Sequence, residues 1–170
     1  MRKRYLNISE LNNILRKESN MKKITSFTVD HTKISEGMYI SRIDGDITTY
    51  DLRMRKPNAG DYITVSAMHT MEHMFATFIR NSSIADDIIY FGPMGCQTGF
   101  YLLVRNADHE RVFVEIHKVL EQIISYNGEV FGNSEVECGN YRTLNLDTAH
   151  KEAMRYLDVL DNLKNHSFTY

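Results

Sequence analysis

Two histidines stand four residues apart in the segment His69-Thr70-Met71-Glu72-His73. In a helix, residues at this spacing lie one turn apart on the same face, so the two imidazoles can bind one divalent cation. Glu72 completes the pattern His-x-x-Glu-His of the inverted zincins, in which a carboxylate moves protons beside the metal. Two ordinary surface histidines would show the same spacing, but the neighbouring Glu72 favours a metal site. The segment therefore predicts a metal site with an acid or base beside it.

The rest of this helix indicates which way the histidines face. With about 100° between successive residues, Arg80 falls on the side of His69 and His73, whereas methionine and phenylalanine residues form the opposite stripe. A solvent-facing helix surface normally carries mixed Lys, Glu and Gln, so two histidines and one arginine favour a cleft. We interpret the Met and Phe stripe as hydrophobic core.

Two cysteines, Cys96 and Cys138, are the candidates for a further ligand. A catalytic zinc-like site uses three protein ligands and leaves one position open, whereas a structural site uses four. Both cysteines would give a closed Cys₂His₂ site, but finger-like sites place their cysteines close together, and these two are far apart. Cys96 follows the small-residue turn Gly92-Pro93-Met94-Gly95, which could expose a thiolate among backbone amides; a buried, inert thiol is the alternative.

The elements that must position these residues follow from hydrophobic periodicity and turn residues. We expect helices at about residues 8–18, Ser66–Asn81 with Ser66 as its cap, a long one capped by Asp108, and a last one starting at Asp147. We expect strands at Lys23–Asp30, Met38–Ile43, Ile47–Met54 and Gln97–Val104, an apolar run Ile88–Phe91 and an extended piece Val130–Cys138. Alternation turns Arg53 away from the apolar face of its strand, toward solvent or a polar cleft. This order predicts an α+β fold, with an antiparallel β-sheet packed against helices in a two-layer sandwich and a single domain.

Composition excludes several classes of function. The chain has 170 residues, 42% of them hydrophobic and 25% charged, which is typical of one compact globular domain. A net charge of −2 offers no basic surface for nucleic acid. Apolar runs are far shorter than the ~20 residues that span a bilayer, so we expect no membrane partner. The basic start Met1-Arg2-Lys3-Arg4 precedes no apolar signal region, and only two cysteines are present, so we expect a cytoplasmic protein.

Several segments together resemble the LuxS family of S-ribosylhomocysteine lyases, bacterial enzymes that make the precursor of autoinducer-2. The resemblance runs from about Ser26 to about Tyr156, and it rests on segments in the order and spacing of that family: Ser26-Phe27-Thr28-Val29-Asp30-His31, Asp51-Leu52-Arg53, Pro57-Asn58, His69-Thr70-Met71-Glu72-His73, Arg80, Pro93-Met94-Gly95-Cys96-Gln97-Thr98-Gly99-Phe100-Tyr101 and Glu137-Cys138-Gly139. The chain departs from the family at Ile89-Tyr90-Phe91-Gly92-Pro93, where many members have Ile-Asp-Ile-Ser-Pro. The resemblance implies a catalytic domain over residues 23–170, so residues 1–22, with the short helix that periodicity predicts, form an N-terminal extension.

The resemblance also implies a ligand set, a substrate pocket and an assembly. Three residues would hold one Fe²⁺ per subunit, replaceable by Zn²⁺ or Co²⁺, with water or substrate in the fourth position: His69, His73 and Cys138. Four residues would line the substrate pocket: Ser26, His31, Arg53 and Arg80. The protein would be a homodimer with its active sites at the subunit interface.

The implied reaction cleaves S-ribosylhomocysteine to homocysteine and 4,5-dihydroxy-2,3-pentanedione, linking autoinducer synthesis and quorum sensing to the activated methyl cycle. Cys96 would be acid and base for two carbonyl shifts, and Glu72 would serve the final β-elimination. Two alternatives remain from the residues alone. An inverted-zincin metallopeptidase would use Glu72 to activate water, but it needs a downstream carboxylate ligand and gives Cys96 no task. A non-enzymatic structural zinc module would use both cysteines.

Overall fold

The computed structural model describes residues 22–24, 27–163 and 167–170. The chain divides into two units, Met1–Asp30 and His31–Tyr170. The predicted strand Lys23–Asp30 is wrong over its described residues: the Phe27 N–H donates to the Ile24 carbonyl (2.9 Å) and closes a turn. Ile24 and Phe27 are 57% and 67% exposed, so little apolar surface is buried here to stabilise a strand. The predicted helix at about 8–18 lies outside the described residues, and the boundary between residues 22 and 23 stays a prediction.

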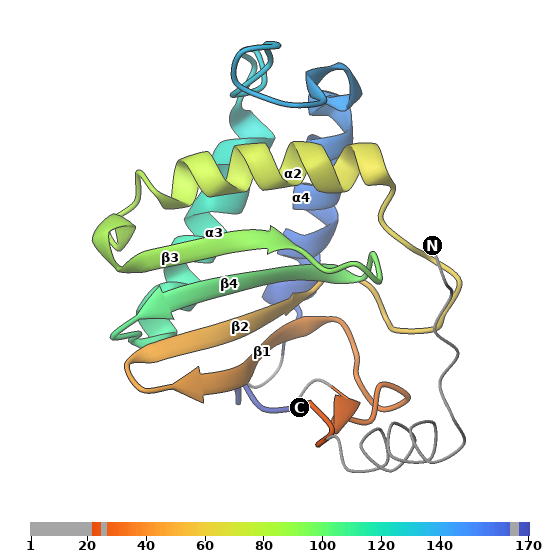
Figure 1. Cartoon of the computed structure of the whole chain (residues 1–170), viewed down its shortest axis with the longest axis vertical. Helices are drawn as coiled ribbons and strands as arrows, with labels where there is room; N and C mark the ends of the chain where they lie inside the picture. Colours follow the sequence, from red (N-terminus) through yellow and green to blue (C-terminus); the bar gives the residue numbers. More distant parts are fainter. Residues whose placement is uncertain (1–21, 25–26, 164–166) are drawn as a thin grey trace, which may run out of the picture. The chain divides into compact units, whose positions relative to one another are not determined.

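The second unit is built on a four-stranded antiparallel sheet with the strand order β1-β2-β4-β3 (Figure 1). Its strands are β1 (Gly37–Asp44), β2 (Ile47–Arg53), β3 (Ile88–Pro93) and β4 (Gly99–Arg105). A two-residue turn joins β1 to β2, where Gly45 supplies a φ of 62°. Cross-strand pairing sets Arg53 between two glycines, Gly37 on β1 and Gly99 on β4. A Cβ at Gly99 would lie 2.2 Å from the Leu52 carbonyl oxygen, so glycine is needed where β4 approaches the end of the central strand β2.

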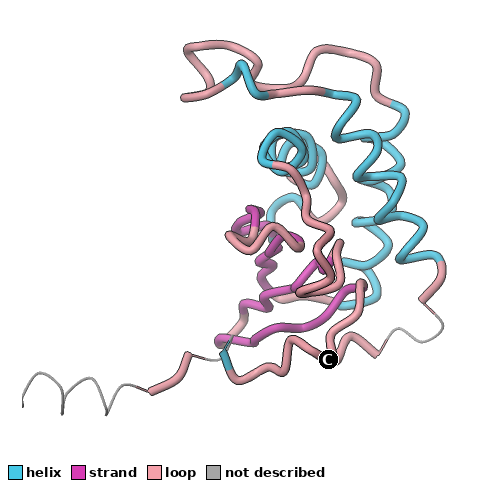
Figure 2. The backbone as a smooth tube through the Cα atoms, turned by 90° about the vertical axis from the view of Figure 1, so that its right-hand side faces the viewer, coloured by secondary structure: helices cyan, strands magenta, loops and turns pink. Residues whose placement is uncertain are grey.

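Three long helices complete the unit: α2 (Val65–Ile79), α3 (His109–Ser125) and α4 (Leu146–Asp161). Helices α3 and α4 lie over one face of the sheet, and α2 runs beside β3 and also contacts α3 and α4 (Figures 1 and 2). The core between them holds Leu52 from β2, Phe75 from α2, Leu120 from α3 and Tyr156 from α4, each almost fully buried. The predicted α+β class and antiparallel sheet are confirmed, and the Met and Phe stripe of α2 is core, as expected.

The N-terminal caps of the three helices agree only in part with the predicted ones. The predicted Asp108 cap of α3 is confirmed, since its carboxylate accepts from the Arg111 N–H at 3.1 Å. Helix α2 starts at Val65 with Thr64 as its cap, and Ser66 instead donates to the Thr143 carbonyl at 2.6 Å. Helix α4 starts at Leu146 with Asn145 as its cap rather than at Asp147. In both corrections the observed cap residue lies two positions before the predicted one. Two short 3₁₀ turns, η2 (Ala85–Asp87) and η3 (Tyr141–Thr143), complete the described elements.

A buried ion pair fixes the segment that leads from β2 toward α2. The Arg55 side chain is 4% exposed and donates to both carboxylate oxygens of Glu152 on α4, at 2.7 and 2.6 Å. We expect Arg55→Met to lower the free energy of unfolding by about 3 kcal/mol, because it leaves a carboxylate unpaired in a confined site. Urea denaturation measures the change. The control Arg105→Met removes a half-exposed pair with Asp46 and should cost under about 1 kcal/mol; equal losses would contradict the assignment.

Within the described residues, none of the helices combines the length and the apolar character needed to cross a bilayer.

Candidate metal centre and active site

His69, His73 and Cys138 form a cluster whose ligand atoms all lie within 4.8 Å of one another. The two imidazole rings, one turn apart on α2, stand at 89° with centroids 4.7 Å apart. The Cys138 Sγ lies 3.4 Å from the Nε2 of His69. Among the described residues, this is the one group of at least three His, Cys, Asp or Glu side chains with such spacing. Cys96 is not part of it, so the cluster offers three protein ligands rather than four.

Hydrogen bonds orient both imidazoles so that Nε2 faces the cluster. The Nδ1 of His73 donates to the Phe131 carbonyl at 2.7 Å. The Nδ1 of His69 lies 2.7 Å from Thr143 Oγ1, whose own proton goes to the Asn140 carbonyl, so Thr143 accepts from His69. Donation from Nδ1 fixes the tautomer that leaves the Nε2 lone pair available for a metal. Burial, followed by the neighbouring His73, lowers the pKa of His69 and so favours the neutral imidazole that a metal needs.

The loop after α3 brings Cys138 to the helix. The predicted extended piece Val130–Cys138 is wrong: Gly132 adopts a φ of 70°, and the Cys138 N–H donates to the Ser134 carbonyl at 3.0 Å, which closes a turn. The Asn140 N–H donates to the Cys138 Sγ at 3.4 Å, which helps to hold the sulfur in place. Two imidazoles and one thiolate are a donor set that suits Zn²⁺ or Fe²⁺, so the residues fit a divalent transition metal.

Gly132 is needed for this close approach. A Cβ at this position would lie 2.9 Å from the Nδ1 of His73, and its φ of 70° disfavours other residues. We expect Gly132→Ala to push the ring off the Phe131 carbonyl and to weaken metal affinity about 10- to 100-fold, as loss of a ligand's hydrogen-bond partner commonly does. Competition with a chromophoric chelator measures the affinity. Gly139→Ala is the control, because nothing lies within 4 Å of the place that its added methyl group would take; equal losses would contradict the assigned role.

Glu72 lines two depressions, one along the first half of α2 and one along its second half. With His69 it lines a cavity of about 250 Å³ whose far wall includes Met94, Gly95 and Gln97. With His73 it lines a wider depression of about 460 Å³. That depression also contains Arg80, Tyr90 and Glu137, so the predicted stripe of two histidines and Arg80 borders depressions in the surface. Arg80 itself is exposed at the C-terminal end of α2.

Cys96 lies on the turn between β3 and β4, next to residues that wall the smaller cavity. Its thiol is exposed, as predicted, and the following Gln97 has a φ of 61°, which explains why β4 begins at Gly99 rather than at Gln97. The Cys96 Sγ lies 3.0 Å from Thr98 Oγ1. Because Gly95 and Gln97 line the cavity together with His69 and Glu72, the turn brings the thiol's neighbours to the metal cluster.

Arg53 lies on the face of the sheet away from the helices and is 2% exposed. Its surroundings are polar, which is one of the two environments that strand alternation predicted. Its Nη2 pairs with Asp51 Oδ2, and its Nη1 donates to Thr98 Oγ1 at 2.5 Å. Burial raises the pKa of Asp51, and the Arg53 charge opposes that rise. The half-buried His31 also acts electrostatically on Asp51, so this predicted residue lies near the Asp51–Arg53 pair. Ser26 lies outside the described residues.

Sequence reasoning missed Asp51 and Thr98, which connect Arg53 to its surroundings. The signal for Asp51 was present, because residues two apart in a strand share a face. Thr98 carried no such signal, since it precedes β4 and meets Arg53 only through the register of the sheet.

Comparison with known proteins gives a match over most of the chain. The model of the family S-Ribosylhomocysteinase (LuxS) matches residues 24–167. The chain belongs to the LuxS family. It is 44% identical over 156 residues to the S-ribosylhomocysteine lyase of Borreliella afzelii (strain PKo), 44% over 157 residues to that of Desulfotalea psychrophila (strain LSv54 / DSM 12343) and 42% over 155 residues to that of Finegoldia magna (strain ATCC 29328). Each match covers 88% of this chain and 99% of the relative.

The LuxS match includes both parts of the site. Residues 24–167 contain the metal cluster as well as the turn with Cys96 and the Asp51–Arg53 pair. The family resemblance predicted from the sequence is therefore confirmed. The third residue of the cluster is a thiol, whereas an inverted-zincin peptidase needs a carboxylate there.

Proposed function

We propose that the chain is an S-ribosylhomocysteine lyase, which cleaves its substrate to homocysteine and 4,5-dihydroxy-2,3-pentanedione. The observation that carries this proposal is the cavity shared by His69, Glu72 and the neighbours of Cys96. The cavity joins one residue of the metal cluster, the Glu72 carboxylate and the two chain neighbours of Cys96, and the LuxS family match supplies the reaction.

The substrate explains why these groups are needed. Homocysteine sulfur is attached to C5 of a ribose, and the carbonyl of the open sugar is at C1, too remote to acidify the hydrogen on C4. The carbonyl must first move to C2 and then to C3, and each move removes a proton beside a carbonyl and returns it to the neighbouring carbon. Elimination then takes the C4 proton and breaks the C5–S bond. The enzyme therefore needs a reversible proton carrier and a base for the last step.

Cys96 is the proton carrier for the two carbonyl shifts. As a thiolate it removes a proton, and as a thiol it returns it. Its exposed position leaves it accessible to a bound sugar, and the Thr98 hydroxyl at 3.0 Å links it to the Arg53 guanidinium.

Glu72 is the base for the elimination. It lies on α2 between the two histidines and faces both depressions, so its carboxylate reaches the space beside the metal site without belonging to the ligand cluster. In this position it takes the C4 proton as homocysteine leaves, and it returns a proton to C5 when the resulting enol becomes the dione.

Fe²⁺ is the metal we propose for His69, His73 and Cys138, with Zn²⁺ or Co²⁺ as substitutes. When bound, it supplies a Lewis acid that stabilises the negative charge developing on the sugar oxygens. Two free thiols with these tasks suit a reducing compartment, so we propose that the protein works in the bacterial cytoplasm.

Four residues are proposed to bind the substrate: Ser26, His31, Arg53 and Arg80. Arginine binds a carboxylate or neighbouring hydroxyls through its fork of N–H donors. Arg80 is suited to the amino-acid end of the substrate, because it lines the wider depression with Tyr90 and Glu137. Arg53 is suited to the sugar, because Thr98 joins it to Cys96.

We propose a homodimer with its two active sites at the interface. Large apolar side chains border the site and are exposed in the single chain: Val65, on the smaller cavity, by 67%, and Val136, close to Cys138, by 97%. Exposed apolar side chains at a site are typical of an interaction surface. Sedimentation of the metal-loaded protein should give twice the mass of one chain, and a monomer at micromolar concentration would contradict this assembly.

One assay tests the proposed function directly. The Fe²⁺-loaded protein is incubated with S-ribosylhomocysteine without oxygen, and homocysteine is measured by chromatography. We expect one homocysteine per substrate consumed, and none from Cys96→Ala. A folded, metal-loaded protein that releases no homocysteine but cleaves a test peptide would instead support the peptidase alternative.

A further inference from the structure

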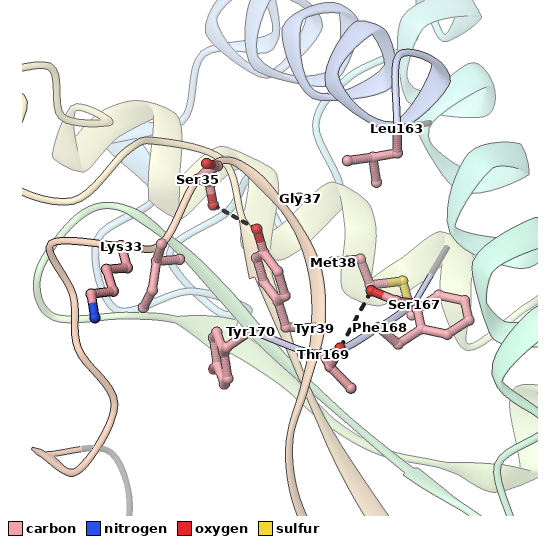
Figure 3. Close-up of a pocket in the computed structure, with 11 residues that line it drawn as sticks. Lys33, Ser35, Gly37, Met38, Tyr39, Leu163, Ser167, Phe168, Thr169 and Tyr170 are labelled. Carbon is pink, nitrogen blue, oxygen red and sulfur yellow. Dashed lines mark hydrogen bonds between the residues drawn. The ribbon is translucent and has the colours of Figure 1, made fainter. Parts of the chain in front are cut away.

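The last residues of the chain run beside β1, the edge strand of the sheet (Figure 3). The Ile40 N–H of β1 donates to the Phe168 carbonyl at 2.7 Å. Phe168 is 8% exposed and packs edge-on against Phe113 of α3, with ring centroids 5.9 Å apart. Its φ of 50° is unusual for a bulky residue, so packing and this hydrogen bond hold a strained turn in place. The C-terminal end is therefore anchored at a defined position.

This anchoring brings Tyr170 to the buried pair of Asp51 and Arg53. The Tyr170 ring stacks on Tyr39, with centroids 4.8 Å apart and planes at 16°, and its hydroxyl donates to Asp51 Oδ2 at 2.8 Å. Tyr39 lies directly opposite Asp51 in the register of β1 and β2, which explains how the stack places the phenol over the carboxylate. Burial raises the pKa of Tyr170, so the phenol stays protonated and donates.

A continuous series of hydrogen bonds then leads from Tyr170 to Cys96. Asp51 Oδ2 accepts from both the Tyr170 hydroxyl and Arg53 Nη2. Arg53 Nη1 donates to Thr98 Oγ1, and Thr98 Oγ1 lies 3.0 Å from the Cys96 Sγ. Asp51 is fully buried, and its Oδ1 has no hydrogen-bond partner among the described residues. The phenol therefore helps to fix the orientation of this carboxylate.

We propose that Tyr170 is a positioning residue of the lyase reaction, which holds Asp51 so that Arg53 stays directed at Thr98 and Cys96. The inference rests on the proposed function, because Arg53 and Cys96 act in it. Tyr170 lies beyond residues 24–167, the part of the chain that the family model matches. Without its hydroxyl, Asp51 can rotate about its side chain and carry the guanidinium away from the thiol.

Tyr170→Phe is the decisive variant, because it keeps the stacked ring and removes one hydroxyl. Tyr39→Phe is the matched control: it removes a hydroxyl from the other ring of the same stack, where the partner is the Ser35 carbonyl at 3.1 Å. We expect Tyr170→Phe to lower kcat about tenfold with little change in thermal midpoint, the usual scale for losing one hydrogen bond to a charged group. Tyr39→Phe should leave kcat within about twofold of the unchanged protein.

A second measurement does not depend on turnover. In the Zn²⁺-loaded full chain, iodoacetamide alkylation of Cys96, followed by mass spectrometry of its peptide, should slow about tenfold in Tyr170→Phe and not in Tyr39→Phe. Unchanged alkylation and kcat in Tyr170→Phe would overturn the proposal, as would equal effects of both variants. If the unchanged protein releases no homocysteine, the proposed function fails, whereas the alkylation result still decides whether Tyr170 acts on Cys96.

Discussion

Cys96→Ala is expected to lower homocysteine release by at least about 10³-fold while one metal per chain is retained. The loss follows from the chemistry, because each positioned acid or base contributes roughly 10²- to 10⁴-fold and Cys96 serves both carbonyl shifts. The metal stays because Cys96 contacts Thr98 and is not part of the ligand cluster. Steady-state kinetics and elemental analysis of the same preparation measure both quantities.

Thr98→Val is a useful companion to this variant. It removes the hydroxyl that links Cys96 to Arg53 but leaves the thiol in place, so we expect an intermediate loss of activity with full metal content. If Cys96→Ala released the metal, the division between catalytic and ligating cysteine would be wrong.

Cys138→Ala is expected to lose the metal, and with it the activity. Removing one of three ligands should weaken affinity by more than the roughly 100-fold that changes around a ligand can cost. The fold should survive, because Cys138 is only half buried and lies on a loop outside the sheet and helices. Elemental analysis after dialysis, with circular dichroism as the check on folding, measures the outcome.

The control for this variant is Cys138→Asp, which keeps an anionic ligand and should retain part of the metal. Full metal content in Cys138→Ala would show that another group, such as Cys96, completes the site.

The sequence predicted the helical half of the site better than the loop half. The spacing of His69 and His73 fixes their geometry within one helix, and the structure has this geometry. The residues alone left the third ligand open, because Cys138 reaches His69 through a loop whose path depends on Gly132 and on turn hydrogen bonds. Only the family resemblance selected Cys138 over Cys96.

Local sequence patterns could not predict hydrogen-bond partners that come from distant parts of the chain. Thr143 and the Phe131 carbonyl orient the two imidazoles, and neither shows a periodic signal. Strand alternation correctly turned Arg53 away from the apolar face. Its partners beyond Asp51 depend on the register that brings Thr98 to it and on Tyr170, which contacts Asp51.

X-ray absorption spectroscopy of the iron-loaded protein tests the central claim most directly, because it counts the sulfur atoms bound to the metal. With His69, His73 and Cys138 as the protein ligands, we predict one sulfur and two imidazole nitrogens, with the remaining coordination filled by exchangeable light atoms. The spectrum should be the same in Cys96→Ala. Two bound sulfurs, or a change on removing the Cys96 thiol, would contradict the account.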